Sequence, residues 1–188
     1  ESFPLWVIFA AVTLAGLLLI LLVALSMRRR SGDSFRYVRQ PVVLTPEERR
    51  GYHDESANTA PVSGYVDRLF AADTLVMVFP VWNFGYPAIL KGFLDRVFLP
   101  GVSFRLVDGK VAPNLTHIRR LAAVTTYGGT RMRAMLAGDP PRRSVTRAVW
   151  HVCRPVRMRY LALYDMNRAD AARRAAFLDR VGREIGAL

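Results

Sequence analysis

Residues Thr74 to Pro87 read TLVMVFPVWNFGYP, and this stretch decides the fold class. Its first part, Thr74–Phe79, is a short, continuous apolar run of β-favouring residues that ends at Pro80. A run of this kind, without polar alternation, is typical of a strand that is buried on both faces of a parallel sheet. The remainder, Pro80 to Pro87, is then the loop that leaves the carboxyl end of the strand.

The segments around this strand alternate between helical and extended patterns. A helix is predicted from Pro87 until Pro100-Gly101 ends it, and Asp108-Gly109 marks a turn between two extended pieces. Thr45, Pro46 and Glu48 have the spacing of a capped helix start. Further helices are predicted over Val62–Ala71, Ser144–Val152 and Ala169–Gly186, and further strands over Arg120–Thr125 and Met158–Tyr164. This alternation predicts an α/β fold with a doubly wound parallel sheet.

The N-terminal part is of another kind. Residues Leu5–Leu25 carry no charge, and about 20 apolar residues span a bilayer core of roughly 30 Å as a helix. Arg28–Arg30 follow, and positive flanks stay on the cytoplasmic side. A signal peptide would carry its charge first, and a buried soluble helix would show a polar stripe. The sequence therefore predicts a transmembrane helix with its basic flank over 1–30, a linker over 31–44, and an α/β domain over 45–188 on the cytoplasmic side of the cell (inner) membrane.

Composition narrows the function classes. The net charge is +12, but the arginines are scattered and form no basic stripe with interleaved aromatics, so no nucleic-acid binding is predicted. Cys153 is the only cysteine, which excludes an intrachain disulfide and a multi-cysteine zinc site. We interpret His151 and Cys153 as structural rather than catalytic. We interpret His53-Asp54-Glu55 as a loop, and no metal site is predicted.

Two loops are candidates for ligand binding, because open α/β sheets bind ligands at the carboxyl ends of their strands. The first combines aromatics, an amide and a glycine, which suit a planar heteroaromatic ring; the alternative is that Trp82 and Phe84 cap the core. The second combines hydroxyls with Gly128-Gly129, although an ordinary strand-to-helix turn has the same composition. The candidate residues are Pro80, Val81, Trp82, Asn83, Phe84 and Gly85 in the first loop, and Thr125, Thr126, Tyr127, Gly128 and Gly129 in the second.

A family resemblance rests on these residues. The stretch VFPVWNFGYPAILKGFLDRVFLPGVSF (Val78–Phe104) resembles the flavodoxin-like NAD(P)H dehydrogenases (quinone), the group that includes DT-diaphorase and the modulator-of-drug-activity proteins. TTYGG and RYLALYDM (Arg159–Met166) fit the same family, and the resemblance runs from Val43 to Leu188. It implies a non-covalent FAD or FMN, with hydride transfer from NAD(P)H to the flavin and then to a quinone. It also implies that the first loop lines the isoalloxazine ring, that the second contacts its pyrimidine side, and that the protein is a homodimer.

The sequence departs from the pattern of this family in two places. The family begins with a strand and an H-P-x-x-x-S-F loop for the flavin phosphate, whereas here Glu1-Ser2-Phe3 precedes the apolar run. A partner that covers the missing first strand, a truncated sequence or a disrupted reading frame would each account for this. The alternative function is then a non-catalytic, membrane-bound structural or interaction subunit. The second departure is that Arg131–Asp139 lacks the Tyr and His of DT-diaphorase; Arg131 or Arg133 could stabilise an anionic reduced flavin, or both could be solvated.

Overall fold

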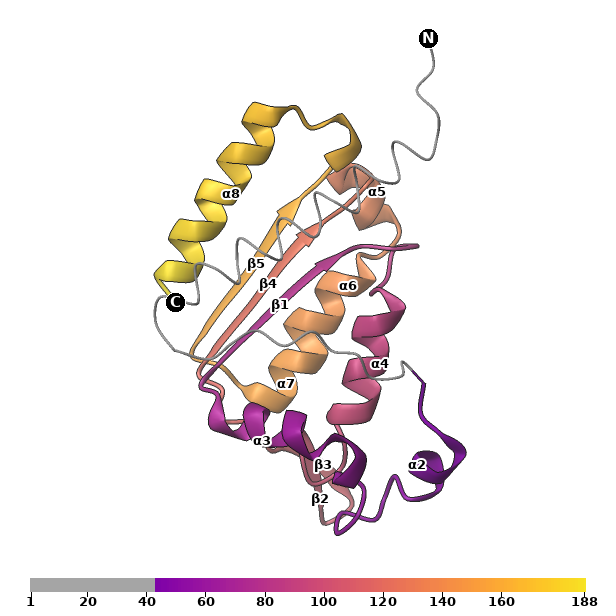
Figure 1. The fold of residues 1–188 in the computed structure, drawn as a ribbon. Coiled ribbons are helices and arrows are strands. Elements are labelled where there is room, and N and C mark those ends of the chain that lie inside the picture. The colour runs from indigo at the N-terminus through magenta and orange to yellow at the C-terminus, as the bar shows by residue number, and fades with distance from the viewer. Residues whose placement is uncertain (1–42) are drawn as a thin grey trace. The chain divides into compact units, whose positions relative to one another are not determined.

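A parallel sheet is the centre of the fold (Figure 1). The computed structural model describes residues 43–188, and its three-stranded sheet has the order β1-β4-β5. The strands are β1 (Thr74–Pro80), β4 (Arg120–Thr126) and β5 (Arg157–Leu163), and both pairings are parallel. The predicted strands are therefore confirmed to within a residue or two at their ends, as is the α/β parallel-sheet class.

The helices also follow the predicted order, with one addition. The helix predicted over Ser144–Val152 starts earlier, because Pro140 and Pro141 occupy first-turn positions where a missing N–H costs nothing. The short helix α5 was not predicted from the sequence. The helices of this part are α2 (Pro46–Arg50), α3 (Ser63–Ala71), α4 (Ala88–Val97), α5 (Arg131–Leu136), α6 (Pro140–Arg143) and α7 (Trp150–Cys153), with η1 (Ala60–Val62), the π-helical η2 (Ser144–Val149) and η3 (Met166–Arg168).

The main core lies on one face of the sheet, between the strands and α3, α4 and the η2–α7 helix (Figure 1). Alternate residues of β1 and β4 supply the strand side of this core. Full burial of a Val, Leu, Ile, Phe or Met side chain contributes roughly 1.5–3 kcal/mol to the stability of the fold. The buried apolar side chains on this face are Val62, Val66, Leu69, Met77, Phe79, Val97, Leu99, Val102, Leu115, Ile118, Leu121, Ala123, Val145, Val149 and Cys153.

Two further elements complete the described chain. The hairpin β2 (Phe104–Val107) and β3 (Lys110–Pro113) turns at Asp108-Gly109, where both residues have positive φ as predicted for a tight turn. The terminal helix α8 (Ala171–Gly186) belongs to a second compact unit and begins at Asp170, whose side chain accepts from Arg173 N–H at 2.7 Å. The predicted transmembrane helix lies outside the described residues. Within residues 43–188, no helix is both long and apolar enough to cross a bilayer.

A buried ion pair fastens the first described helix to α4. The capping box predicted at Thr45 is present, with Thr45 and Glu48 bonded reciprocally. Glu48 also accepts from Arg96, and their side chains are only 11% and 7% exposed. Burial acts to raise the pKa of the Glu48 carboxyl, but the hydrogen bonds from Arg96 and Thr45 outweigh it, and the pKa lies below its ordinary value. A carboxyl with a lowered pKa adds stability above its ordinary pKa and loses it as the pH falls.

We therefore predict that Glu48→Gln lowers the free energy of unfolding by about 3 kcal/mol at pH 7, because the buried Arg96 guanidinium loses the negative charge that Glu48 supplies. The difference from the wild type should shrink as the pH falls below about 4, because Glu48 then becomes protonated in the unfolded chain and, at still lower pH, in the folded protein as well. Urea unfolding across this pH range measures both effects.

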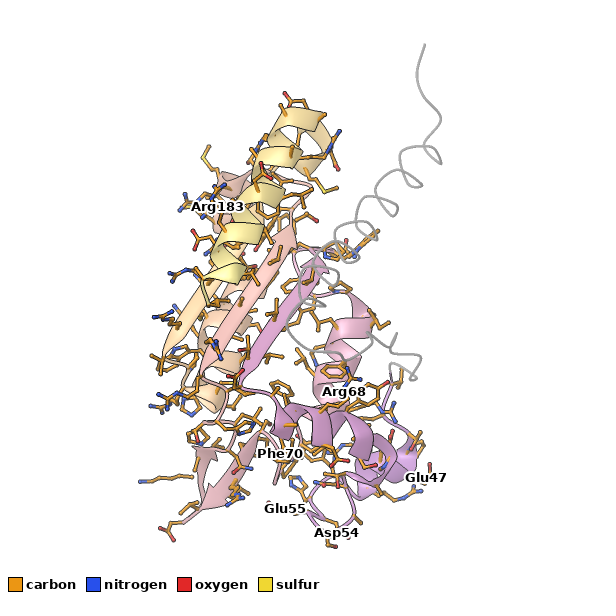
Figure 2. All side chains as sticks on the ribbon, turned by 60° about the vertical axis from the view of Figure 1, so that its left-hand side comes forward. Glu47, Asp54, Glu55, Arg68, Phe70 and Arg183 are labelled. Carbon is orange, nitrogen blue, oxygen red and sulfur yellow. The ribbon has the colours of Figure 1, made fainter. Side chains whose placement is uncertain are left out.

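Glu47→Gln is the matched control on the same helix. Its side chain is 73% exposed, pairs with the exposed Arg50, and points to solvent (Figure 2). We expect a change within about 0.5 kcal/mol at any pH. Equal losses for the two variants would contradict a structural role for the Glu48–Arg96 pair.

Candidate functional site

The two candidate loops meet at one edge of the sheet. The β1–β4 ladder ends at the pair Pro80 and Thr126, and the Val81 N–H donates to the Thr126 carbonyl at 2.8 Å. On the other side, the Tyr127 N–H donates to the Leu163 carbonyl at 2.8 Å. The strands thus end in register. Of the residues predicted for the ligand site, Pro80, Thr125 and Thr126 are the last residues of their strands, and the others follow directly.

The first loop is a tight hairpin turn. Trp82 and Gly85 exchange both backbone hydrogen bonds, at 3.1 and 2.7 Å, while Asn83 and Phe84 have φ of 46° and 57°. Two left-handed residues define a type I′ turn, which favours Asn-Gly; a phenylalanine in that position costs about 1–2 kcal/mol. Trp82 and Phe84 are 44% and 48% exposed, so they do not cap the core as the alternative proposed. The turn instead presents two aromatic side chains to the edge of the sheet.

The second loop offers a ligand backbone groups rather than side chains. Thr125 and Tyr127 point inward and are 0% and 3% exposed, so these two predicted residues offer a ligand only their main chain. Gly128 is exposed, and Thr126 and Gly129 are half-buried. Among the described residues, the N–H groups of Gly128 and Gly129 find no protein acceptor. Two free donors therefore lie beside the aromatic turn.

Neither glycine is required by the protein itself. Gly128 and Gly129 do not have positive φ, and an added Cβ would approach no atom closer than 3.4 Å at Gly128 and 3.8 Å at Gly129. Backbone strain and internal packing therefore do not explain them. Close approach of a ligand to the backbone would explain them, and the residues present fit a planar ring that carries carbonyl acceptors.

A polar cluster beneath this loop was not found from the sequence. The Tyr127 hydroxyl donates to Asp139 Oδ1 at 2.6 Å and lies 2.8 Å from the Tyr160 hydroxyl. Arg142 binds Asp139 Oδ2 at 3.0 Å, donates to the Tyr164 hydroxyl at 2.9 Å, and lies 4.2 Å from the centre of the Tyr160 ring. Burial first, and the hydrogen bond to Asp139 second, hold the pKa of Tyr127 far above its ordinary value. The phenol therefore stays a neutral donor.

An open cavity of about 830 Å³ reaches the first loop. Gly85 and Tyr86 line one end of it, and α4 and the η2–α7 helix supply mostly apolar walls, including Leu94, Phe98, Val149 and Val152. Its volume is in the range of small-molecule sites, which run from about 300 to 1,000 Å³. A ligand at the turn would have apolar surface next to it.

The remaining candidates lie elsewhere. Cys153 is fully buried, and burial raises its pKa to about 12, which supports the structural interpretation. Asp54 accepts from the backbone and hydroxyl of Ser56 and closes a turn, and Asp54 and Glu55 lie near the end of the sheet where the strands begin (Figure 2). Within the described part of the chain, no group of His, Cys, Asp or Glu side chains is arranged to hold a metal ion.

Arg131 and Arg133 are exposed on α5, and their role toward a flavin stays a prediction.

Comparison with known proteins decides the family. Residues 27–185 match a family model described as a flavodoxin-like fold. The chain belongs to this flavodoxin-like family. An FMN-dependent NADH:quinone oxidoreductase of Bordetella petrii is 33% identical over 87 residues, which are 46% of this chain and 41% of that protein. The match thus spans less than half the length of this relative.

Solved structures show the same fold. An FMN-dependent NADH-azoreductase from Bacillus anthracis in complex with FMN has a TM-score of 0.70 at 12% identity, and the match covers 92% of this chain and 90% of that one. An NAD(P)H:quinone oxidoreductase from Methanothermobacter marburgensis has a TM-score of 0.69 at 19% identity, covering 90% and 87%. At these identities the likeness of this flavodoxin-like chain to both proteins concerns the fold.

The strain in the turn predicts that one substitution raises the thermal stability but weakens ligand binding. Phe84→Gly creates Asn-Gly, the favoured pair for a type I′ turn, and should raise Tm by roughly 2–4 °C per kcal/mol of relieved strain. The same change removes an exposed ring from the candidate ligand site, so it should weaken binding of a planar ring there, for which FMN serves as the probe. Differential scanning calorimetry and FMN titration measure the two effects.

Phe70→Ala is the control for loss of an exposed aromatic. Phe70 is 44% exposed on α3, near the end of the sheet where the strands begin (Figure 2). This variant should leave FMN binding unchanged. If Phe84→Gly binds FMN as well as the wild type does, the turn is not part of a flavin site.

Proposed function

We propose that this chain is a flavin-dependent NAD(P)H:quinone oxidoreductase that holds FMN between its two candidate loops. A bound flavin supplies the chemistry, which is acceptance of a hydride from NAD(P)H and reduction of a quinone. The observation that carries the proposal is the pair of free N–H groups at Gly128 and Gly129 beside two half-exposed aromatics. Both features suit one planar, carbonyl-bearing ring.

Each loop has a separate task in this proposal. Trp82 and Phe84 provide apolar surface against which a ring packs, and the rigid turn fixes their backbone before the ligand arrives. Gly128 and Gly129 provide donors to the carbonyl and nitrogen acceptors of the pyrimidine edge. Thr125 and Tyr127 anchor the second loop from inside, and the open cavity from Gly85 leaves apolar space for a quinone.

The choice of FMN over FAD rests on related proteins. The Bordetella petrii relative is named FMN-dependent, and the Bacillus anthracis structure contains FMN. The same two names specify NADH rather than NADPH. We therefore propose FMN and NADH first, with FAD and NADPH as the alternatives that a binding experiment distinguishes.

The deciding experiment is an absorption spectrum of the chain purified in mild detergent. We expect flavin bands close to stoichiometric amounts after addition of FMN, bleaching with NADH, and recovery when a quinone is added. A colourless protein that retains neither FMN nor FAD would contradict the enzyme and favour the non-catalytic, membrane-bound subunit.

Gly129→Ala tests whether the flavin uses the second loop. The added methyl group meets no protein atom closer than 3.8 Å, so stability should hold or rise by roughly 0.4–1 kcal/mol while FMN affinity falls. Gly64→Ala on α3, where a Cβ meets nothing within 4 Å, is the matched control and should bind FMN normally. Equal FMN affinity in both variants would exclude approach of the flavin to Gly129.

We also propose that Leu5–Leu25 crosses the cell membrane, with the flavodoxin-like domain on its cytoplasmic side. The family match begins at residue 27, directly after this uncharged run and just before Arg28–Arg30. The chain should therefore resist extraction from membranes by alkaline carbonate, whereas the double variant Leu14→Arg, Leu18→Arg should be released, because each charge costs about 2.5–3.5 kcal/mol at a helix centre. Release of the wild type would contradict the tether.

A homodimer is proposed for the assembly, with a partner at the open edge of β1 as the alternative. Among the described residues, β1 pairs only with β4 and leaves its other edge without a strand. Light scattering of the detergent-purified chain should give the mass of two copies after correction for detergent. A mass of one copy would contradict the homodimer.

A further inference from the structure

Tyr127 is a main point at which the second loop is fixed, through both its backbone and its side chain. Its N–H donates to the Leu163 carbonyl at 2.8 Å, and its own carbonyl accepts from the Met166 N–H at 2.9 Å. These bonds tie the loop to the end of β5 on one side. The inward-pointing Tyr127 side chain ties it on the other, and its ring lies 4.5 Å from that of Tyr164. The adjacent Gly128 and Gly129 have no side chains to hold them. The bonds of Tyr127 fix them at one end, and the Gly129 carbonyl, which accepts from the Asp165 N–H at 2.8 Å, fixes them at the other.

Asp139 holds the Tyr127 side chain in place. It is 8% exposed and lies 2.6 Å from the Tyr127 hydroxyl, a short bond of the kind that a carboxylate forms with a phenol. Its second oxygen accepts from Arg142, so both oxygens have a donor and the buried charge is paired. The bond from Tyr127 to Asp139 therefore joins the glycine loop to a fixed ion pair.

The backbone around Asp139 is built to present this carboxylate. Asp139 has φ 46° and ψ 57°, a left-handed conformation that a few non-glycine residues such as Asp and Asn tolerate. Its N–H donates to the Ala134 carbonyl at 2.8 Å, and its carbonyl accepts from the Arg143 N–H at 3.0 Å. The residue thus closes the link between α5 and α6 and directs its side chain back under the loop that precedes α5. Unusual backbone conformations of this kind cluster where a functional geometry must be held.

We propose that Asp139 is a positioning residue for the flavin, which acts through Tyr127 to hold the free N–H groups of Gly128 and Gly129 in place for the pyrimidine edge. The inference rests on the proposed function. A donor fixed before binding loses less entropy on binding than a mobile one, and it stabilises developing negative charge without reorganisation. Asp139 therefore contributes to flavin affinity and potential although it lies below the loop.

Three variants separate this role from simple stabilisation. Tyr127→Phe removes the donor to Asp139 and keeps the ring, and Asp139→Asn removes the charge at a position where Asn tolerates the backbone. Tyr160→Phe is the matched control, because it removes a hydroxyl of the same cluster but leaves the bond from Tyr127 to Asp139. All three should lower the thermal stability of the flavin-free protein.

Only the first two should change the loop and the flavin. We expect Tyr127→Phe and Asp139→Asn to weaken FMN binding about tenfold by fluorescence titration, with hydrogen exchange of the Tyr127 and Met166 amides accelerated in the flavin-free protein. The reduced flavin, which carries more negative charge on this edge, should lose a further factor of about ten, which lowers its two-electron potential by about 30 mV. In Tyr160→Phe, FMN affinity, amide exchange and potential should stay at wild-type values.

A double variant tests the route of action. If Asp139 acts through Tyr127, adding Asp139→Asn to Tyr127→Phe should not weaken FMN binding further. Wild-type affinity and potential in both single variants, or equal changes in Tyr160→Phe, would overturn the positioning role. If the wild type itself binds no flavin, the proposed function fails and this role fails with it; amide exchange would still show whether Asp139 orders the loop.

Discussion

The hydrogen bond from the Val81 N–H to the Thr126 carbonyl carries the β1–β4 ladder past the last paired residues and into the loops. It is the contact on which the candidate site depends. Because parallel strands in register end at the same edge, the aromatic turn and the glycine loop leave the sheet side by side. A slip of one residue in this register would reverse the inward and outward positions along β1 and bury the wrong face.

Several residues that contradict local preferences lie at this edge. A phenylalanine occupies a left-handed turn position that suits glycine, while two glycines occupy positions that any residue could take. Large aromatic side chains are half exposed, and backbone donors lack acceptors within the described chain. The left-handed phenylalanine and the donors without acceptors cost stability, and the two glycines add none. Their coincidence at one place is the pattern of a binding site.

The cluster below the glycine loop gives this edge rigidity. Arg142 and Asp139 form a partly buried ion pair, and three tyrosines complete its hydrogen bonds and ring contacts. The resemblance to DT-diaphorase leads one to expect a Tyr and a His in Arg131–Asp139, and this chain has neither. A paired aspartate ends the segment instead, facing inward rather than toward a ligand. As a consequence, the glycine loop is held by contacts on its inner side, and its outward surface consists mainly of backbone groups.

The sequence alone determined the order of strands and helices, because the apolar run Thr74–Phe79 and the helical spacing after Pro87 depend only on local burial patterns. It also placed the two loops at strand ends. Sequence could not find α5 or the start of α6, since Pro140-Pro141 reads as a break until its position at a helix start is known. The left-handed turn at Phe84, the inward direction of Thr125 and Tyr127, and the pairing of Tyr127 with Asp139 were decided only by tertiary structure. Those contacts join residues through the sheet and helix layers, and no local pattern encodes which side chains will meet there.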